Sequence, residues 1–151
     1  MKFIDGESYL PQVLQMIETS ALNLNQDTAF QHFENELRDA QAKYLPPHGN
    51  LIVAENDGEF QGMVAYTRIN DERCEMKRLY VRREARGQHL GEQLVDKILE
   101  KAKEAGFVEM ITIMPSSLSS VINLCDKHGF ENFSEEGLVL PENNICLIRD
   151  L

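Results

Sequence analysis

Residues 75–91, with the sequence EMKRLYVRREARGQHLG, are the most informative stretch of this chain. Residues 75–81 predict a β-strand, and an Arg-rich turn then leads to Gly87 and Gly91, which bracket the start of an amphipathic helix. A strand that feeds a helix through a glycine-containing loop leaves the first backbone N–H groups of the helix without intrahelical partners. These donors and the positive end of the helix dipole form an anion site. The segment therefore predicts a phosphate site, and more specifically a site for the pyrophosphate of a nucleotide-bearing cofactor.

The charge of this segment is opposite to that of the whole chain. The formal net charge is −10, which argues against nucleic acid or an anionic membrane as a partner, because both need a basic face. Five of the fifteen basic residues nevertheless lie within ten positions, and they are Lys77, Arg78, Arg82, Arg83 and Arg86. The cluster is either a solvated, salt-bridged edge or the site where an anionic cofactor binds. The acidic remainder of the surface would favour a cationic acceptor such as an amine.

Length and composition are those of a soluble globular protein. The 151 residues, 42% hydrophobic and 26% charged, are enough for one domain with a sizeable core. No apolar run approaches the roughly 20 residues of a membrane span, and the start of the chain lacks the apolar stretch of a signal peptide. The three cysteines, Cys74, Cys125 and Cys146, are far apart and include no CxxC pair. This pattern predicts reduced thiols in a cytoplasmic protein.

The periodicity of the sequence changes from helical to strand-like after Gly49. Pro11, tolerated in a first helical turn, and the cap at Asp27 or Thr28 predict two N-terminal helices before Pro46. The later elements are strands over residues 51–56, 62–69 and 74–81, a helix over 90–105, a strand over 110–114 and a helix over about 118–128. A closing strand pair follows, and its last strand covers 145–148. This order predicts an α+β domain with a mixed sheet, in which the strands on either side of the first of these helices run parallel.

Three segments carry a family resemblance. RGQHLG resembles the acyl-CoA-binding loop of the GNAT superfamily of N-acetyltransferases, in which Gln or Arg and two variable residues precede Gly, a variable residue and Gly or Ala. Arg86 fills the first place and Gly91 the last, while His89 stands where a Gly is usual. MKRLYV and LCDKHGF resemble the strand and the helix end of the same superfamily, in the expected order and spacing. The similarity covers roughly residues 50–133.

The resemblance implies an α+β, three-layer fold of the acyl-CoA N-acyltransferase type. Its central sheet would be mixed and mostly antiparallel, with a splayed parallel strand pair and flanking helices. Residues 1–151 would form one domain, with helices over about residues 8–43 on the acceptor side. The co-substrate would be acetyl-CoA, whose pantetheine arm enters between the splayed strands. The residues implied to bind it are Leu79, Tyr80 and Val81, through backbone groups, and Arg86, Gly87, Gln88, His89, Leu90 and Gly91, around the pyrophosphate.

Two residues are candidates for catalysis of acetyl transfer to an amine. Glu75 lies four residues before Leu79, so regular alternation would place it on the strand face of Leu79 and Val81, toward the gap, where it could act as general base. Its place also matches a glutamate base of some members; the alternative is an exposed strand glutamate. Cys125 stands where members often have the Tyr that protonates the CoA sulfur. It is either a weaker acid acting through water or, as we favour, a buried filler.

The acceptor is expected to be a primary amine of a small molecule or peptide, attacked directly in a ternary complex. A CoA-binding sensor with weak or lost catalysis is the alternative, and an interaction protein that uses the fold as a scaffold is a third. No metal is expected, because the four histidines are dispersed without ligand spacing. Neither nucleic acid nor a membrane is expected as a partner. An exposed edge strand would allow a homodimer.

Overall fold

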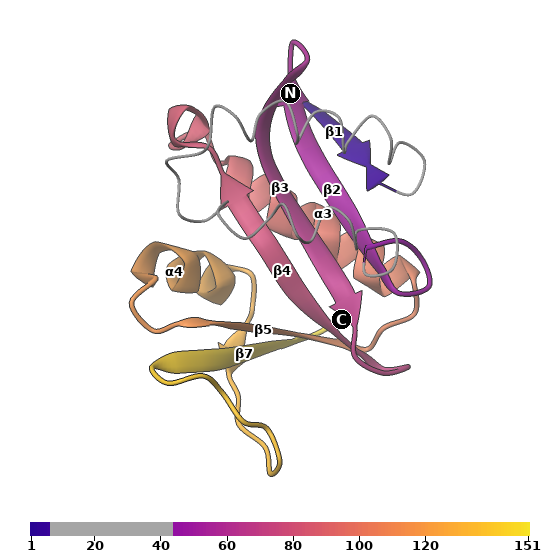
Figure 1. The fold of residues 1–151 in the computed structure, drawn as a ribbon, viewed down its shortest axis with the longest axis vertical. Helices are drawn as coiled ribbons and strands as arrows, with labels where there is room; N and C mark the ends of the chain where they lie inside the picture. The colour runs from indigo at the N-terminus through magenta and orange to yellow at the C-terminus, as the bar shows by residue number, and fades with distance from the viewer. Residues whose placement is uncertain (7–43) are drawn as a thin grey trace.

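A single mixed β-sheet organises the part of the chain that the computed structural model describes, residues 1–6 and 44–151. Within these residues the sheet has seven strands in the order β1-β2-β3-β4-β5-β7-β6 (Figure 1). Their bounds are β1 Lys2–Asp5, β2 Gly49–Asn56, β3 Glu59–Arg68, β4 Arg73–Val81, β5 Glu109–Pro115, β6 Glu131–Asn132 and β7 Asn144–Asp150. The helices in this described part of the chain are the 3-10 turn Arg83–Ala85, α3 Leu90–Glu104 and α4 Ser119–Lys127.

Only one pair of neighbouring strands is parallel within this sheet. β4 and β5 run in the same direction, whereas every other adjacent pair is antiparallel. The parallel pair is connected through α3, because a parallel connection must cross over a face of the sheet. The predicted α+β fold, with a mixed, mostly antiparallel sheet, a splayed parallel pair and flanking helices, is therefore confirmed.

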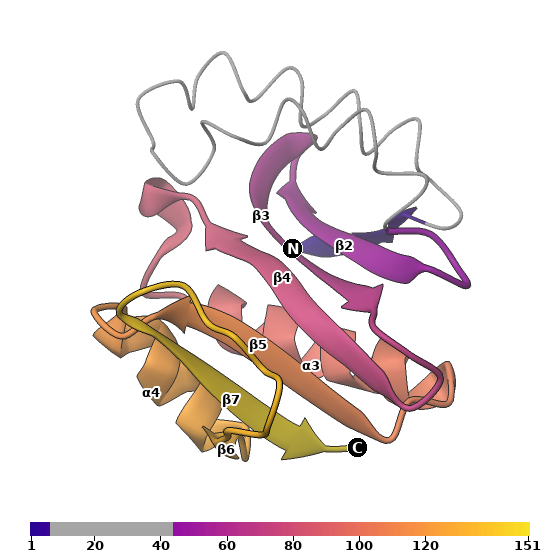
Figure 2. The ribbon, with the colours of Figure 1, turned by 60° about the horizontal axis from the view of Figure 1, so that its bottom comes forward.

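Helices α3 and α4 lie on the same face of the sheet (Figure 2). The predicted apolar stripe of α3 is buried against that face, with Leu94, Val95 and Ile98 fully inside. This core also contains Cys125 and Phe130 from α4 and the turn that follows it. Burial of such a stripe is the main force that holds a helix of this length in place. No helix among the described residues is long and apolar enough to cross a membrane.

Sequence reasoning missed the first strand and did not reach the segment after it. β1 pairs antiparallel with β2 at the sheet edge, from Lys2↔Glu55 to Asp5↔Ile52. A strand of four residues is too short for a period of two to be recognised, even with the turn signal Asp5-Gly6 at its end. The predicted N-terminal helices and acceptor side fall on residues 7–43, outside the described part of the chain.

Candidate functional site

The parallel strands β4 and β5 separate along their length. They pair only at Arg73↔Glu109, Cys74↔Met110 and Glu75↔Ile111, and beyond these positions the ribbons diverge (Figure 1). A cavity of about 340 Å³ fills the space between them. It is lined from β4 by Glu75 to Tyr80, from β5 by Thr112 to Pro115, and from the start of α4 by Leu118 and Val121. The described structure thus contains the gap that the sequence implied.

A β-bulge in β4 lies in this separated region. β3 residues Met63 and Ala65 are two apart, but their partners Tyr80 and Lys77 are three apart, so β4 carries one extra residue. Arg78 has the positive φ of 59° at this point. An extra residue bends the strand and reverses the alternation of side chains that follow it. The bulge therefore helps β4 to leave β5.

The bulge corrects our placement of Glu75. Leu79 and Val81 pack against the core beneath α3, as Met76 does, whereas Glu75 alternates with Met76 and so points to the opposite face. Regular alternation predicted one shared face for Glu75, Leu79 and Val81, and this was wrong because the extra residue intervenes. Glu75 still lines the cavity. Its carboxylate therefore approaches the gap from the face opposite to α3 and α4.

Glu75 is a partly buried base candidate. Its side chain is 19% exposed, and Lys77 Nζ lies 4.0 Å from Glu75 Oε2. Burial raises the pKa of the Glu75 carboxyl above its ordinary value, and the Lys77 ammonium opposes this only in part. A raised carboxyl pKa makes the carboxylate a better proton acceptor near neutral pH. The environment of Glu75 is therefore suited to general-base work.

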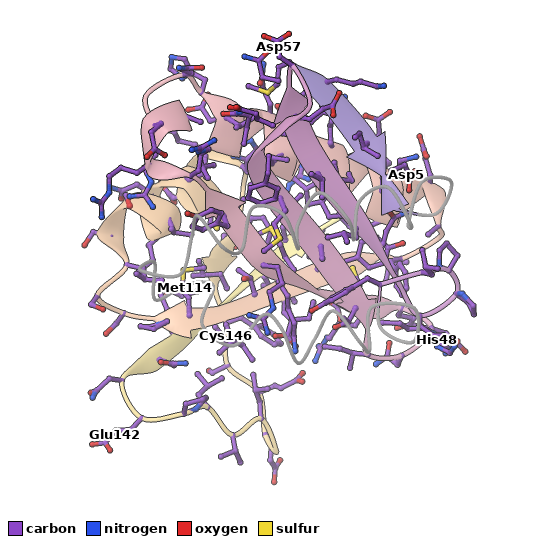
Figure 3. All side chains as sticks on the ribbon, turned by 45° about the horizontal axis from the view of Figure 1, so that its top comes forward. Asp5, His48, Asp57, Met114, Glu142 and Cys146 are labelled. Atoms are coloured by element: carbon purple, nitrogen blue, oxygen red, sulfur yellow. The ribbon has the colours of Figure 1, made fainter. Side chains whose placement is uncertain are left out.

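The Glu75 carboxylate raises the pKa of two further residues on this side of the sheet. Burial first and the Glu75 carboxylate second raise the pKa of the Tyr44 hydroxyl to about 12. The same two causes, in the same order, raise the pKa of the Cys146 thiol. Cys146 lies on β7, beside the end of β5 that carries Met114 (Figure 3). Tyr44 was not among our candidates, because it precedes β2 in a stretch without a recognisable motif.

The loop from Arg86 to the first turn of α3 has the features of an anion site. No side chain caps α3, whose N-cap residue is His89, so its first N–H groups are available to a ligand. Arg86 donates from Nε to the Val81 carbonyl O at 3.0 Å, which orients the guanidinium beside the end of β4. Arg86 forms no ion pair with any residue that the structure describes. A fixed guanidinium next to unpaired amides fits the oxygens of a pyrophosphate.

Both glycines of the loop have a structural role. Gly87 has a φ of +85°, a conformation that L side chains rarely adopt. Gly91 allows close approach, because a Cβ on it would meet Leu124 of α4 at 3.2 Å. Gln88 and Leu90 lie between them, with Gln88 exposed and Leu90 buried in the core. The backbone of this turn is therefore held against α4 and β4.

His89 adopts the conformation that usually selects glycine. Its φ is 60° and its ψ is 20°, in the left-handed region. The side chain is 79% exposed, and its Nδ1 lies 3.5 Å from Glu92 Oε2. The ring therefore points outward, and the residue contributes its backbone to the loop.

Some residues of the basic cluster form a salt-bridged edge, whereas others are available to an anionic cofactor. Arg82 is part of a salt-bridged edge, since its guanidinium lies 3.0 Å from the Glu84 carboxylate and 3.8 Å from that of Glu59. Arg83 and Arg86 have no carboxylate partner among residues 1–6 and 44–151. The unpaired charges are thus those nearest the start of α3.

Cys125 lies in the hydrophobic core, away from the cavity. The side chain is fully buried, in the cluster that joins α3, α4 and the sheet, and it is not among the residues that line the space between β4 and β5. Burial raises the pKa of its thiol to about 11. The surroundings of Cys125 therefore favour the filler interpretation over the acid, and its role in turnover stays a prediction.

Known proteins share the sequence pattern and the fold of this chain. The model of the Acetyltransferase (GNAT) family matches residues 12–130. This chain belongs to the GNAT family. It is 34% identical over 146 residues to an uncharacterised N-acetyltransferase of Schizosaccharomyces pombe, covering 93% of this chain and 89% of that protein.

Solved acetyltransferase structures share the fold at low sequence identity. An acetyltransferase from Streptococcus agalactiae superposes with a TM-score of 0.74 at 16% identity, over 99% of this chain and 98% of its own. The PaiA N-acetyltransferase from Thermoplasma acidophilum, in complex with coenzyme A, gives a TM-score of 0.66 at 15% identity over the whole of both chains. The GNAT fold predicted from the sequence is thereby confirmed.

Proposed function

We propose that this GNAT protein transfers the acetyl group of acetyl-CoA to a primary amine of a small molecule or peptide, by direct attack in a ternary complex. The cavity between β4 and β5 carries the proposal, because it runs along β4 toward the loop that opens α3. The coenzyme A complex of the PaiA protein supports the same ligand here. Three buried, free thiols are compatible with a cytoplasmic location.

Recognition of the co-substrate would rest on the loop and on the backbone of β4. Arg86 and the uncapped amides of α3 would bind the pyrophosphate. Backbone groups of Leu79, Tyr80 and Val81 would bond the pantetheine arm, since β4 and β5 form no ladder at these positions. Acetyl-CoA supplies an acetyl group activated as a thioester.

Glu75 would take the proton of the acceptor. A protonated amine cannot attack, so a carboxylate at the end of the cavity raises the fraction of free amine where it is needed. Glu75 lines the cavity from the face opposite to α3 and α4. The acceptor would therefore approach from that face, while the acyl group is held between the strands.

The test is an acceptor screen. The parent protein is incubated with acetyl-CoA and a panel of primary amines, and released thiol is measured against a no-acceptor control. We expect acceptor-dependent thiol release together with a product heavier by one acetyl group. Tight CoA binding without transfer to any amine would contradict the enzyme proposal.

One observation favours a second candidate, a CoA-binding sensor with weak catalysis. Cys125, at the position of the usual acid, is buried with a raised pKa and lies off the cavity. Such a protein would bind acetyl-CoA and CoA with affinities set by the cavity but would show no saturable dependence on an amine. An acceptor-dependent kcat well above the rate of thioester hydrolysis would exclude this candidate.

A further inference from the structure

Just beyond the last backbone pair between β4 and β5, a side chain supplies the next hydrogen bond between the two strands. That last backbone pair is Glu75↔Ile111, so the next pair in the same register would be Met76 and Thr112. At that position Thr112 Oγ1 donates a hydrogen bond to the Met76 carbonyl O at 3.3 Å. A hydroxyl thus takes the place of a backbone donor where the strands part.

Both partners of this bond are buried. Thr112 is 4% exposed and Met76 is 3% exposed. A buried carbonyl left without a hydrogen-bond donor is unfavourable. The Thr112 hydroxyl supplies that donor to the Met76 carbonyl at a position where β4 and β5 no longer pair through their backbones. Two residues later the bulge at Arg78 turns β4 away. The bond therefore lies between the closed part of the ladder and its open part.

This position is the far end of the cavity. β4 runs from Arg73 to Val81, and the loop at residues 86–91 follows it, so a ligand anchored at the loop reaches Glu75 and Thr112 with its opposite end. Both residues line the cavity. If acetyl-CoA binds as proposed above, its acyl group lies against this end.

We propose that Thr112 is a positioning residue, whose hydroxyl fixes where β4 and β5 part and so limits the length of the acyl group that fits. The inference rests on the proposed use of acyl-CoA. The bond holds β4 and β5 together just beyond the last pair of the ladder. The space left in the cavity for the acyl chain of the thioester is then small. Longer acyl groups would have to separate the strands further.

A matched pair of variants isolates the hydroxyl. Thr112→Val keeps the shape of the side chain but places a methyl group against the Met76 carbonyl, which removes its donor. Without that bond the strand ends loosen and the cavity deepens. Thr112→Ser keeps the hydroxyl and serves as the rescue.

The experiment is calorimetric titration of acetyl-, propionyl- and butyryl-CoA into the parent and both variants, which needs no acceptor. In the parent we expect affinity to fall with acyl length. In Thr112→Val we expect acetyl-CoA to bind several-fold more weakly and the penalty for butyryl-CoA relative to acetyl-CoA to shrink. Thr112→Ser should keep the parental pattern. Equal weakening of all three ligands would indicate a purely structural role and would overturn the proposal.

Hydrogen exchange of the ligand-free proteins gives a second, independent measurement. The amide of Met76, which faces β5 at the last pair of the ladder, should exchange faster in Thr112→Val than in the parent or Thr112→Ser. If valine prevents folding, Thr112→Ala carries the same comparison. A folded variant without the hydroxyl that keeps the parental length preference and exchange rates overturns the proposal, as does a stricter preference for acetyl. A parent that binds no acyl-CoA contradicts the proposed function instead, and exchange alone then tests the role of Thr112.

Discussion

The two ends of the proposed acetyl-CoA site, the loop at residues 86–91 and the far end of the cavity between β4 and β5, are built differently. The end at the loop consists of backbone amides, an exposed arginine and a histidine whose ring points away. The far end consists of two side chains, the half-buried Glu75 and the buried Thr112. Both lie where the pairing of β4 and β5 ends. Recognition at the loop should therefore tolerate substitution of most side chains, whereas chemistry at the far end should depend on one carboxyl group.

The largest effect is expected from Glu75→Gln, which removes the base and keeps its size. Turnover should fall by about 10²–10⁴, the usual contribution of general-base assistance, with nearly unchanged CoA affinity. Glu136→Gln, in an exposed loop, is the control and should match the parent. Steady-state kinetics and calorimetry measure the two quantities. Parental turnover in Glu75→Gln across pH 6 to 9 would reduce Glu75 to an ordinary strand residue.

The pH dependence of the same variant sharpens the assignment. Because burial raises the pKa of Glu75, the base is lost on acidification through a value above the ordinary Glu pKa of about 4.3. The parental rate should therefore show an acidic limb that Glu75→Gln lacks, and the deficit should shrink as pH approaches the pKa of the amine. A deficit that is equal at every pH would indicate that Glu75 orients the acceptor.

Stability should respond to Glu75 in the opposite direction from activity. A folded-state pKa above the unfolded one means that the ionised carboxylate is disfavoured in the fold, a cost that is present above the folded pKa and absent below the unfolded pKa. Glu75→Gln should thus be more stable than the parent at neutral pH, with the difference vanishing below about pH 4. Denaturant unfolding at several pH values measures this. A less stable variant at neutral pH would contradict the assigned burial cost.

Arg86→Ala should produce the next largest effect, at the loop. We expect CoA affinity to fall by about 1.5–3 kcal/mol, the range for hydrogen bonds to charged groups, or about 10- to 150-fold. Arg83→Ala removes an equal charge from the adjoining 3-10 turn and should lose less, because it lacks the anchor that Val81 gives to Arg86. Isothermal calorimetry at fixed ionic strength compares them. Equal losses would mean that only net charge matters.

The backbone geometry of the loop was easier to predict from the sequence than the faces of the side chains at the far end, for a physical reason, and binding of the co-substrate at the loop stays a prediction. Backbone sites leave local signals, such as Gly87 with its positive φ and Gly91 with its close contact to α4. The bulge in β4 depends on pairing with β3 and left no such signal at Arg78, so the face of Glu75 was predicted wrongly. The role of Thr112 could not be predicted from the sequence, because its hydrogen-bond partner, the Met76 carbonyl, is 36 residues away in the chain.

Cys125→Ala should change turnover by less than about tenfold if the thiol is only packing, which is a small effect beside general acid catalysis. The variant should lose stability, on the order of 1 kcal/mol, because the side chain is fully buried. Kinetics and thermal unfolding separate the two. A folded variant that lost a hundredfold or more would make the thiol an acid. Cys125→Tyr should destabilise the fold by overpacking the core around α4.

His89→Gly is expected to have the smallest effect. Relief of the left-handed conformation gains about 1–2 kcal/mol, and the greater freedom of glycine in the unfolded chain offsets about half of it, so the fold should become slightly more stable. CoA affinity should stay the same, because the ring points outward. Denaturant unfolding and calorimetry test both points. A clear loss of affinity would give the imidazole a role in binding phosphate.

Hydrogen exchange with and without acetyl-CoA shows whether the co-substrate lies along the cavity with its pyrophosphate at the loop. Binding along the cavity with the pyrophosphate at the loop should protect amides in two separate segments, residues 79–81 and residues 87–92. The 3-10 turn between them, Arg83–Ala85, should change less, and Arg86→Ala should reduce protection at the loop at equal ligand concentration. Binding of acetyl-CoA that protects neither segment, or that protects only residues elsewhere, would contradict the account.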